Sequence, residues 1–123
     1  MAVHSVKVEK LKGIFDGLDR HFVAELILVL RPFFMQVGET IRVDGHVPDQ
    51  VYIVNIGHLQ VLRPEGGNWV ITGLMNEGSV AGMSAAMLNN KADFMLCAPI
   101  ATDMWFIETH ELKMVLDYYP EEG

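Results

Sequence analysis

A run of short strands separated by turns, from Gly38 to Leu62, constrains the fold of this chain more than any other feature. Residues 51–54 are all strand formers, and a second run rich in strand formers follows Gly57. Asp44-Gly45 marks a bend before the first run, and Gly57 stands where a bulge or tight bend is expected. Several short strands at this spacing predict a small antiparallel β fold.

Two helices are expected before these strands. Residues 6–15 carry apolar residues at helical spacing, and Asp19 is a suitable N-cap for a second helix. Pro32 ends that second helix, because the residue before a proline avoids helical angles. The apolar stripe of the second helix consists of Phe22, Leu26, Val29 and Leu30.

From Phe33 onward the apolar period changes to two, which indicates strands. Residues 84–88 have helical composition instead, and Thr109 caps a closing helix that Pro120 ends. The expected strands are 33–37, 40–43, 51–56, 58–63, 69–74, 92–100 and 102–107, with a hairpin loop at 64–68. The predicted fold class is α+β, mainly β: an antiparallel β-roll or jelly-roll barrel with short N-terminal helices, a short inserted helix and a C-terminal helix.

Composition limits the functions that such a domain can have. The 123 residues are enough for one domain with one core, and a formal net charge of −7 opposes binding to nucleic acid at long range. Cys97 has no partner for an internal disulfide, and its apolar surroundings predict a buried side chain. The five histidines show no metal-ligand spacing, and no serine or cysteine has the neighbours of a nucleophile. The sequence therefore predicts a protein that is not an enzyme and holds no metal.

Two further patterns concern surfaces. No stretch has the roughly 20 apolar residues of a membrane span, and no targeting segment is visible, so the chain as given is expected to be soluble. The methionines fit no ligand set and are expected to fill the core. Trp105 and Phe106 occupy adjacent strand positions and should face opposite ways, with at least one of them reaching the surface or a partner segment outside this chain.

The order of several short motifs resembles the cyclic-nucleotide-binding domain family over almost the whole chain. The resemblance is carried by Ile14–Asp19, Leu30-Arg31-Pro32, Gly38-Glu39, Gly45, Tyr52, Gly57, Asp103–Ile107, Glu111-Leu112 and Tyr119-Pro120. It implies one domain, 1–123, with a β-roll over 32–107. It also implies a phosphate-cassette equivalent over 78–92 and a closing helix over 108–120, with the family's lid helix outside the chain.

In this family a cyclic nucleotide lies on the short helix of the cassette. Backbone N–H groups hold the phosphate, a glutamate binds the ribose hydroxyl, and an arginine pairs with the phosphate. Here Gly82 keeps the glycine, whereas Met83 stands at the glutamate position and Ala92 at the arginine position. Lys91 lies one residue earlier and should point to the other face. If a nucleotide binds, the resemblance places it on Gly82, Met83, Ser84, Ala85, Lys91 and Ala92.

The resemblance implies two alternative functions. The first is a regulatory, non-catalytic domain on the cytoplasmic side of a voltage-gated or cyclic-nucleotide-gated type of cation channel, or of a channel-like transporter. Its pocket would be eroded, with cAMP or cGMP bound weakly or not at all and no cofactor. Its partner would be the rest of the membrane protein, and the protein's own C-terminal segment could fill the pocket. The second is a working cAMP or cGMP sensor with a non-standard cassette.

Overall fold

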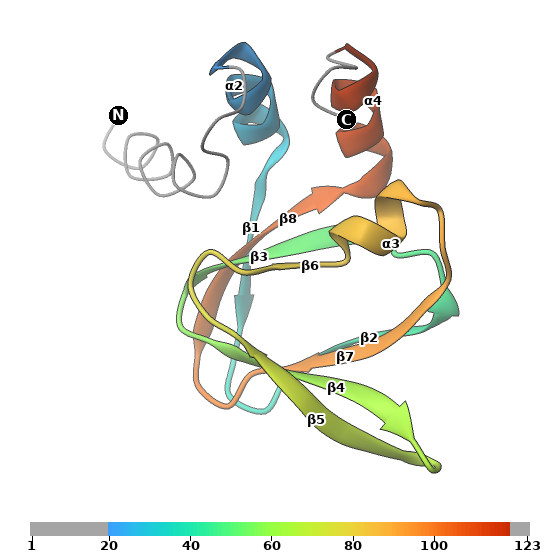
Figure 1. Cartoon of the computed structure of the whole chain (residues 1–123). Coiled ribbons are helices and arrows are strands. Elements are labelled where there is room, and N and C mark those ends of the chain that lie inside the picture. The colour runs from blue at the N-terminus through green and yellow to red at the C-terminus, as the bar shows by residue number, and fades with distance from the viewer. Residues whose placement is uncertain (1–19, 119–123) are drawn as a thin grey trace.

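The computed structural model describes residues 20–118, which form a roll of two four-stranded sheets with two helices stacked on one side (Figure 1). The elements are α2 (Arg20–Val29), β1 (Arg31–Met35), β2 (Thr40–His46), β3 (Gln50–Ile56), β4 (Leu59–Glu65), β5 (Asn68–Met75), β6 (Val80–Ala81), α3 (Met83–Met87), β7 (Ala92–Cys97), β8 (Thr102–Glu108) and α4 (Thr109–Tyr118). The predicted fold class is confirmed. The helix expected over 6–15, the Asp19 cap and the end of the closing helix at Pro120 lie outside the described residues.

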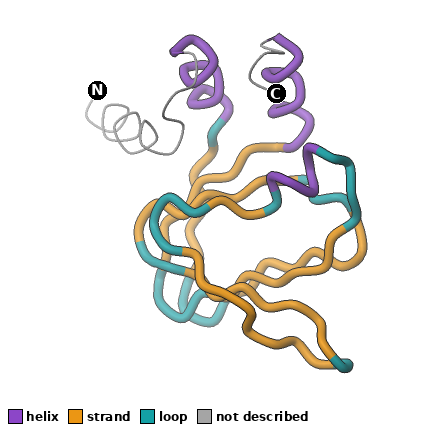
Figure 2. The backbone as a smooth tube through the Cα atoms, viewed as in Figure 1, coloured by secondary structure: helices purple, strands orange, loops and turns teal. Residues whose placement is uncertain are grey.

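Every strand pair in the two sheets is antiparallel. One sheet has the order β1-β8-β3-β6, and the other has the order β2-β7-β4-β5. Figure 2 shows the strands as a continuous roll, with α3 at one rim and with α2 and α4 next to each other beyond the first sheet. Within residues 20–118, no helix combines the length and apolar character that crossing a membrane requires.

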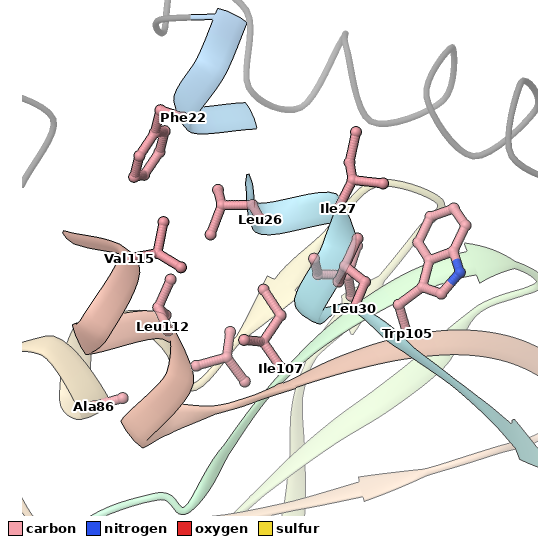
Figure 3. Packing of buried hydrophobic residues seen from close by; sticks show 11 residues of the cluster. Phe22, Leu26, Ile27, Leu30, Ala86, Trp105, Ile107, Leu112 and Val115 are labelled. Carbon is pink, nitrogen blue, oxygen red and sulfur yellow. The ribbon is translucent and has the colours of Figure 1, made fainter. Parts of the chain in front are cut away.

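Alternating residues of β3 divide the core into two clusters. Val51 and Ile53 belong to a buried cluster with residues of α2 and α4. Figure 3 shows Leu26 of α2, Leu112 of α4 and Trp105 of β8 in this cluster. Tyr52 of β3 faces the interior of the roll, because successive strand residues point to opposite faces. We call the group that contains Val51 and Ile53 the helix-side cluster, and the group that contains Tyr52 the roll-interior cluster.

Trp105 and Phe106 face opposite ways, as predicted. Trp105 is only 7% exposed in the helix-side cluster, whereas Phe106 packs against the roll-interior cluster and is partly exposed. The expectation for Cys97 is wrong: it is only partly buried, because it faces outward from β7 while Leu96 and Ala98 are buried.

Several element boundaries differ from those predicted. Strand β1 begins at Arg31 and contains Pro32, which is tolerated because β1 lies at the edge of its sheet. The hairpin loop is shorter than the expected 64–68, because β4 and β5 are joined at Gly66-Gly67, whose positive φ angles of 58° and 84° suit a two-residue turn. The strand expected over 92–100 ends at Cys97, two residues before Pro99. The two-residue strand β6 was not predicted.

Candidate functional site

The segment that corresponds to the cassette runs from β6 through α3 to β7. Ala81 of β6 pairs with Tyr52 of β3, and Gly82 then begins α3 with a left-handed φ of 89°. A Cβ atom at Gly82 would lie 3.3 Å from the carbonyl oxygen of Gln50 and 3.7 Å from Cβ of Pro48. Both the backbone angle and the close approach therefore require glycine at this position.

Met83, Ser84 and Ala85, in the first half of the predicted site, differ in the surroundings of their side chains. Met83 packs against the helix-side cluster and not against the roll-interior cluster. Ser84 is exposed and Ala85 is partly buried, and neither side chain is charged. The backbone of the helix is regular, with the N–H of Ala86 donating to the carbonyl oxygen of Gly82 at 2.9 Å.

The second half of the predicted site lies at the start of β7. Ala92 packs against the roll-interior cluster, as do Phe94 and Leu96, which follow at a period of two. Lys91 is exposed just before the strand begins, and Asp93 is exposed on the outer face. The inward position that the resemblance assigns to an arginine is therefore occupied by a methyl group, and the nearby cation lies in solvent.

Phe94 is a site residue that the sequence reasoning missed. Its ring is 5% exposed, and its Cζ atom lies 3.9 Å from the place where a Cβ of Gly82 would be. The ring thus reaches from β7 to the start of α3 and occupies the space beside the cassette. The alternation of Ala92, Phe94 and Leu96 was the signal that could have placed this ring inside the roll.

Aromatic rings line the roll interior next to this segment. The ring centroids of Phe33, Tyr52 and Phe106 lie 6.2–6.5 Å apart, within the range of favourable aromatic contacts. The Tyr52 hydroxyl donates to Oε1 of Gln50, and Nε2 of Gln50 donates to Oε1 of Glu108 at 3.0 Å. Burial, and then the Glu108 and Asp49 carboxylates, raise the pKa of Tyr52 because they disfavour the phenolate.

The loop between β2 and β3 connects the cassette to α4. Thr109 begins α4, and its Oγ1 donates to the carbonyl oxygen of Pro48 at 2.8 Å. The N–H of Thr109 donates to the carbonyl oxygen of Asp49, also at 2.8 Å. Since Pro48 and Gln50 also form the wall against Gly82, this loop contacts both the first residue of the closing helix and the start of the cassette.

Few polar side chains are buried in the part of the chain that the structure describes. Among residues 21–118, the buried polar residues are Thr102 and Thr109, and both hydroxyls already donate to backbone carbonyl oxygens. The same residues bury no lysine or arginine, and the described part of the chain contains no group of three or more metal-ligating side chains. Backbone N–H groups at the start of α3 are the remaining donors of the kind that holds a phosphate.

Comparison with known proteins agrees with the fold and the motif order. The chain is 28% identical over 127 residues to a cyclic nucleotide-gated channel of Caenorhabditis elegans, covering 98% of the chain and 17% of the channel. It is 25% identical over 113 residues to human cyclic nucleotide-gated channel beta-1, covering 89% of the chain and 9% of that protein. The regulatory domain of Toxoplasma gondii PKA, crystallised with cAMP, superposes with a TM-score of 0.83 at 17% identity, covering 93% of this chain and 44% of that one. No protein-family model matches the chain.

These findings define the structural class of the protein. It is an antiparallel β-roll with a short helix inserted between two of its strands and a closing helix after the last strand. The chain is similar in sequence to cyclic nucleotide-gated channels and in fold to the PKA regulatory domain. It spans less than a fifth of each of the two channels.

Proposed function

We propose that this chain is a regulatory, non-catalytic domain on the cytoplasmic side of a cation channel or channel-like transporter. In this proposal its nucleotide pocket has lost the side chains that would anchor a cyclic nucleotide. The similarity to cyclic nucleotide-gated channels over nearly the whole chain supports the channel context. The proposed loss of the nucleotide-anchoring side chains depends on the chemistry of the cassette.

One observation carries the proposal: the inward position at the start of β7 is Ala92, and the Phe94 ring fills the space beside Gly82. A phosphate in a partly dry site needs a charged hydrogen-bond partner, because burial of an unpaired charge is costly. Lys91 is exposed before the strand and does not supply this partner from the interior. Met83 packs toward the helices and offers no hydrogen bond to a ribose.

Regulation would then act through the position of α4 relative to the roll. The contacts of Thr109 with Pro48 and Asp49 fix the start of α4 to the loop that also contacts the cassette. Arg31 of β1 pairs with Glu111 of α4 at 2.9 Å on the exposed side. A force on α4 from the rest of the parent protein would therefore be transmitted to the roll at these points.

Titration with cAMP and with cGMP, followed by amide chemical shifts, tests the pocket. We expect no saturable shifts in residues 78–92 below about millimolar ligand, because removing one charged partner costs a few kcal/mol and each 1.4 kcal/mol is tenfold in affinity. Saturable shifts at micromolar ligand would instead establish the alternative, a sensor that holds the phosphate on the backbone N–H groups beginning at Gly82.

A gain-of-binding variant makes the test sharper. Ala92→Arg restores a phosphate partner at the inward position, and we expect affinity to rise about tenfold or more from this contact. The matched control is Asp93→Arg, which places the arginine on the outer face of β7. Equal affinities for the two variants would show that the missing arginine is not what limits binding.

The channel context has its own test, which is the coding sequence on both sides of this chain. Transmembrane spans upstream are expected for a channel or transporter. A kinase-inhibitor segment in that position would contradict the proposal and indicate a kinase regulator.

A further inference from the structure

Among the strands that the structure describes, β5 of the β4–β5 hairpin has the most exposed large apolar residues. The hairpin projects from the roll on the side away from α2 and α4 (Figure 1). Val70, Ile71 and Leu74 of β5 are 39%, 53% and 63% exposed, and their side chains cover both faces of the strand. Within the described residues, β5 pairs with β4 alone, so its second edge has free backbone hydrogen-bonding groups.

The free edge of β5 lacks most of the features that protect edge strands from pairing. Such strands are usually short or contain charges or prolines. The eight residues Asn68–Met75 contain neither a charge nor a proline. A bulge interrupts the pairing with β4 at Thr72, which leaves Asn68–Ile71 as a regular stretch. This stretch, with Trp69, Val70 and Ile71, has high strand propensity.

The outer face of the same sheet continues the apolar surface. The register places Ile71 opposite Leu62, and Leu62 opposite Met95 of β7. At the end of this row the Arg42 guanidinium lies 4.8 Å from the centroid of the Trp69 ring, and it also pairs with Asp44 at 2.8 Å. The row therefore presents apolar side chains and one cation whose charge is already paired.

Charge distinguishes this hairpin from the rest of the chain. Residues 59–75 contain one arginine, Arg63, and one glutamate, Glu65, so their charges cancel, whereas the whole chain carries −7. A charged partner would gain no electrostatic attraction at this edge. Two copies of the chain, which repel each other over most of their surfaces, can approach here without local repulsion. A neutral apolar strand edge is therefore best complemented by the same edge of a second copy.

We propose that two copies of this chain pair through their β5 strands, antiparallel about a twofold axis. The two sheets of order β2-β7-β4-β5 then join into one sheet of eight strands, and Ile71 and Trp69 of each copy extend the outer apolar row of the other. An eight-residue strand is about 26 Å long, so this contact buries less than the roughly 1,600 Å² of a standard interface. The expected dimer is therefore weak, with a dissociation constant in the micromolar range or above.

Sedimentation velocity over protein concentrations from about 5 to 500 μM tests this proposal. We expect a reversible monomer–dimer equilibrium, and Ile71→Lys should raise the dissociation constant at least tenfold. The matched control is Ile56→Lys, because Ile56 is also 53% exposed but lies on β3 of the other sheet. A purely monomeric chain at the highest concentration, or a dimer equally insensitive to both substitutions, would overturn the proposal.

A second measurement does not depend on any variant. Amide hydrogen exchange of the unmodified chain is compared at low and high concentration, and the protection of residues 68–71 should increase with concentration. An increase confined to another surface contradicts the β5 contact, as does a chain that stays monomeric and co-sediments with neutral lipid vesicles. None of these outcomes depends on nucleotide binding, so the test is independent of the proposed function.

Discussion

At the scale of single residues, Gly57 is a position where both the backbone angle and a close contact oppose any other amino acid. Its φ is +114°, and a Cβ there would lie 2.7 Å from Oγ1 of the buried Thr102. Gly38 also has a positive φ, of +85°, but has no atom within 4 Å of the corresponding position. We predict that Gly57→Ala lowers the free energy of unfolding by about 3 kcal/mol and Gly38→Ala by about 1 kcal/mol. Equal losses in urea denaturation would show that the contact with Thr102 is not limiting.

Tyr52 provides a prediction about pH. Burial and the neighbouring carboxylates raise its pKa above the ordinary value of 10.0, so the unfolded chain ionises first as the pH rises. The stability that Tyr52 contributes is therefore complete below about pH 10 and is lost as the pH approaches the higher pKa of the folded state.

Comparison with Tyr52→Phe isolates this effect from other groups. At pH 7 the variant should be less stable by about 1 kcal/mol, because Gln50 loses a hydrogen bond. Between about pH 9 and pH 11 that difference should shrink, since only the wild-type chain has the Tyr52 ionisation. Urea denaturation at several pH values measures it, and a difference that stays constant across the range would contradict the assigned direction of the pKa shift.

The sequence predicted some residues of the candidate site and missed others, for a physical reason. The resemblance placed Gly82 in the cassette, where the structure gives it a positive φ, and strand alternation turned Lys91 away from the inner face, where the structure exposes it. Their role in binding a ligand stays a prediction. The position of Phe94 was not predicted, because its ring fills space that is defined by Gly82 and therefore by a different part of the chain. The Gln50–Glu108 hydrogen bond joins residues 58 positions apart, and no local pattern indicates it.

At the scale of elements, the start of α4 depends on one buried hydroxyl. Thr109 is 8% exposed, and its Oγ1 donates to the carbonyl oxygen of Pro48. Thr109→Val keeps the shape but leaves that carbonyl without its donor, which should cost about 1–3 kcal/mol. Thr72→Val is the matched control, because Thr72 is exposed and its hydroxyl contact with Val61 is 3.4 Å long; its effect should stay within about 0.5 kcal/mol.

Hydrogen exchange distinguishes a local effect from a global one. If Thr109 fixes α4 to the roll, Thr109→Val should increase exchange in residues 109–118 more than in β3. Uniform acceleration across the domain would mean that the threonine supports the whole fold rather than the attachment of this helix.

Element types were predicted better than element boundaries. Apolar periods distinguished α2 from the longer strands, because the period depends on which face each element buries. The short helix α3 was predicted from its composition instead, and β6 was not predicted. Boundaries depend on pairing, which is a tertiary property. Pro32 ended the helix as predicted but then joined β1, since an edge strand can accommodate a missing N–H. The two-residue β6 exists only because Ala81 and Val80 pair with β3.

At the scale of the whole molecule, one sheet separates the two clusters and contributes to both. Val51 and Ile53 of β3 belong to the helix-side cluster, while Tyr52 and Val54 belong to the roll-interior cluster. The helices therefore cannot leave without exposing the side chains that also hold β3 in place. We therefore predict that the domain unfolds as a single cooperative unit, even though its helices and its roll are distinct layers.

The two tryptophans report on different sides of this arrangement. Trp105 lies in the helix-side cluster, whereas Trp69 lies on β5 of the opposite sheet. We predict that the single-tryptophan variants Trp69→Phe and Trp105→Phe each show a fluorescence transition in urea that coincides with the transition of their own far-ultraviolet circular dichroism.

Leu112→Ala and Leu96→Ala, which truncate fully buried side chains in the two clusters, should each lower the free energy of unfolding by about 2–5 kcal/mol. Each should move both fluorescence transitions together. If Leu112→Ala shifted only the Trp105 signal, the helix layer would unfold separately from the roll, and α4 could then detach as a regulatory step while the roll stays folded.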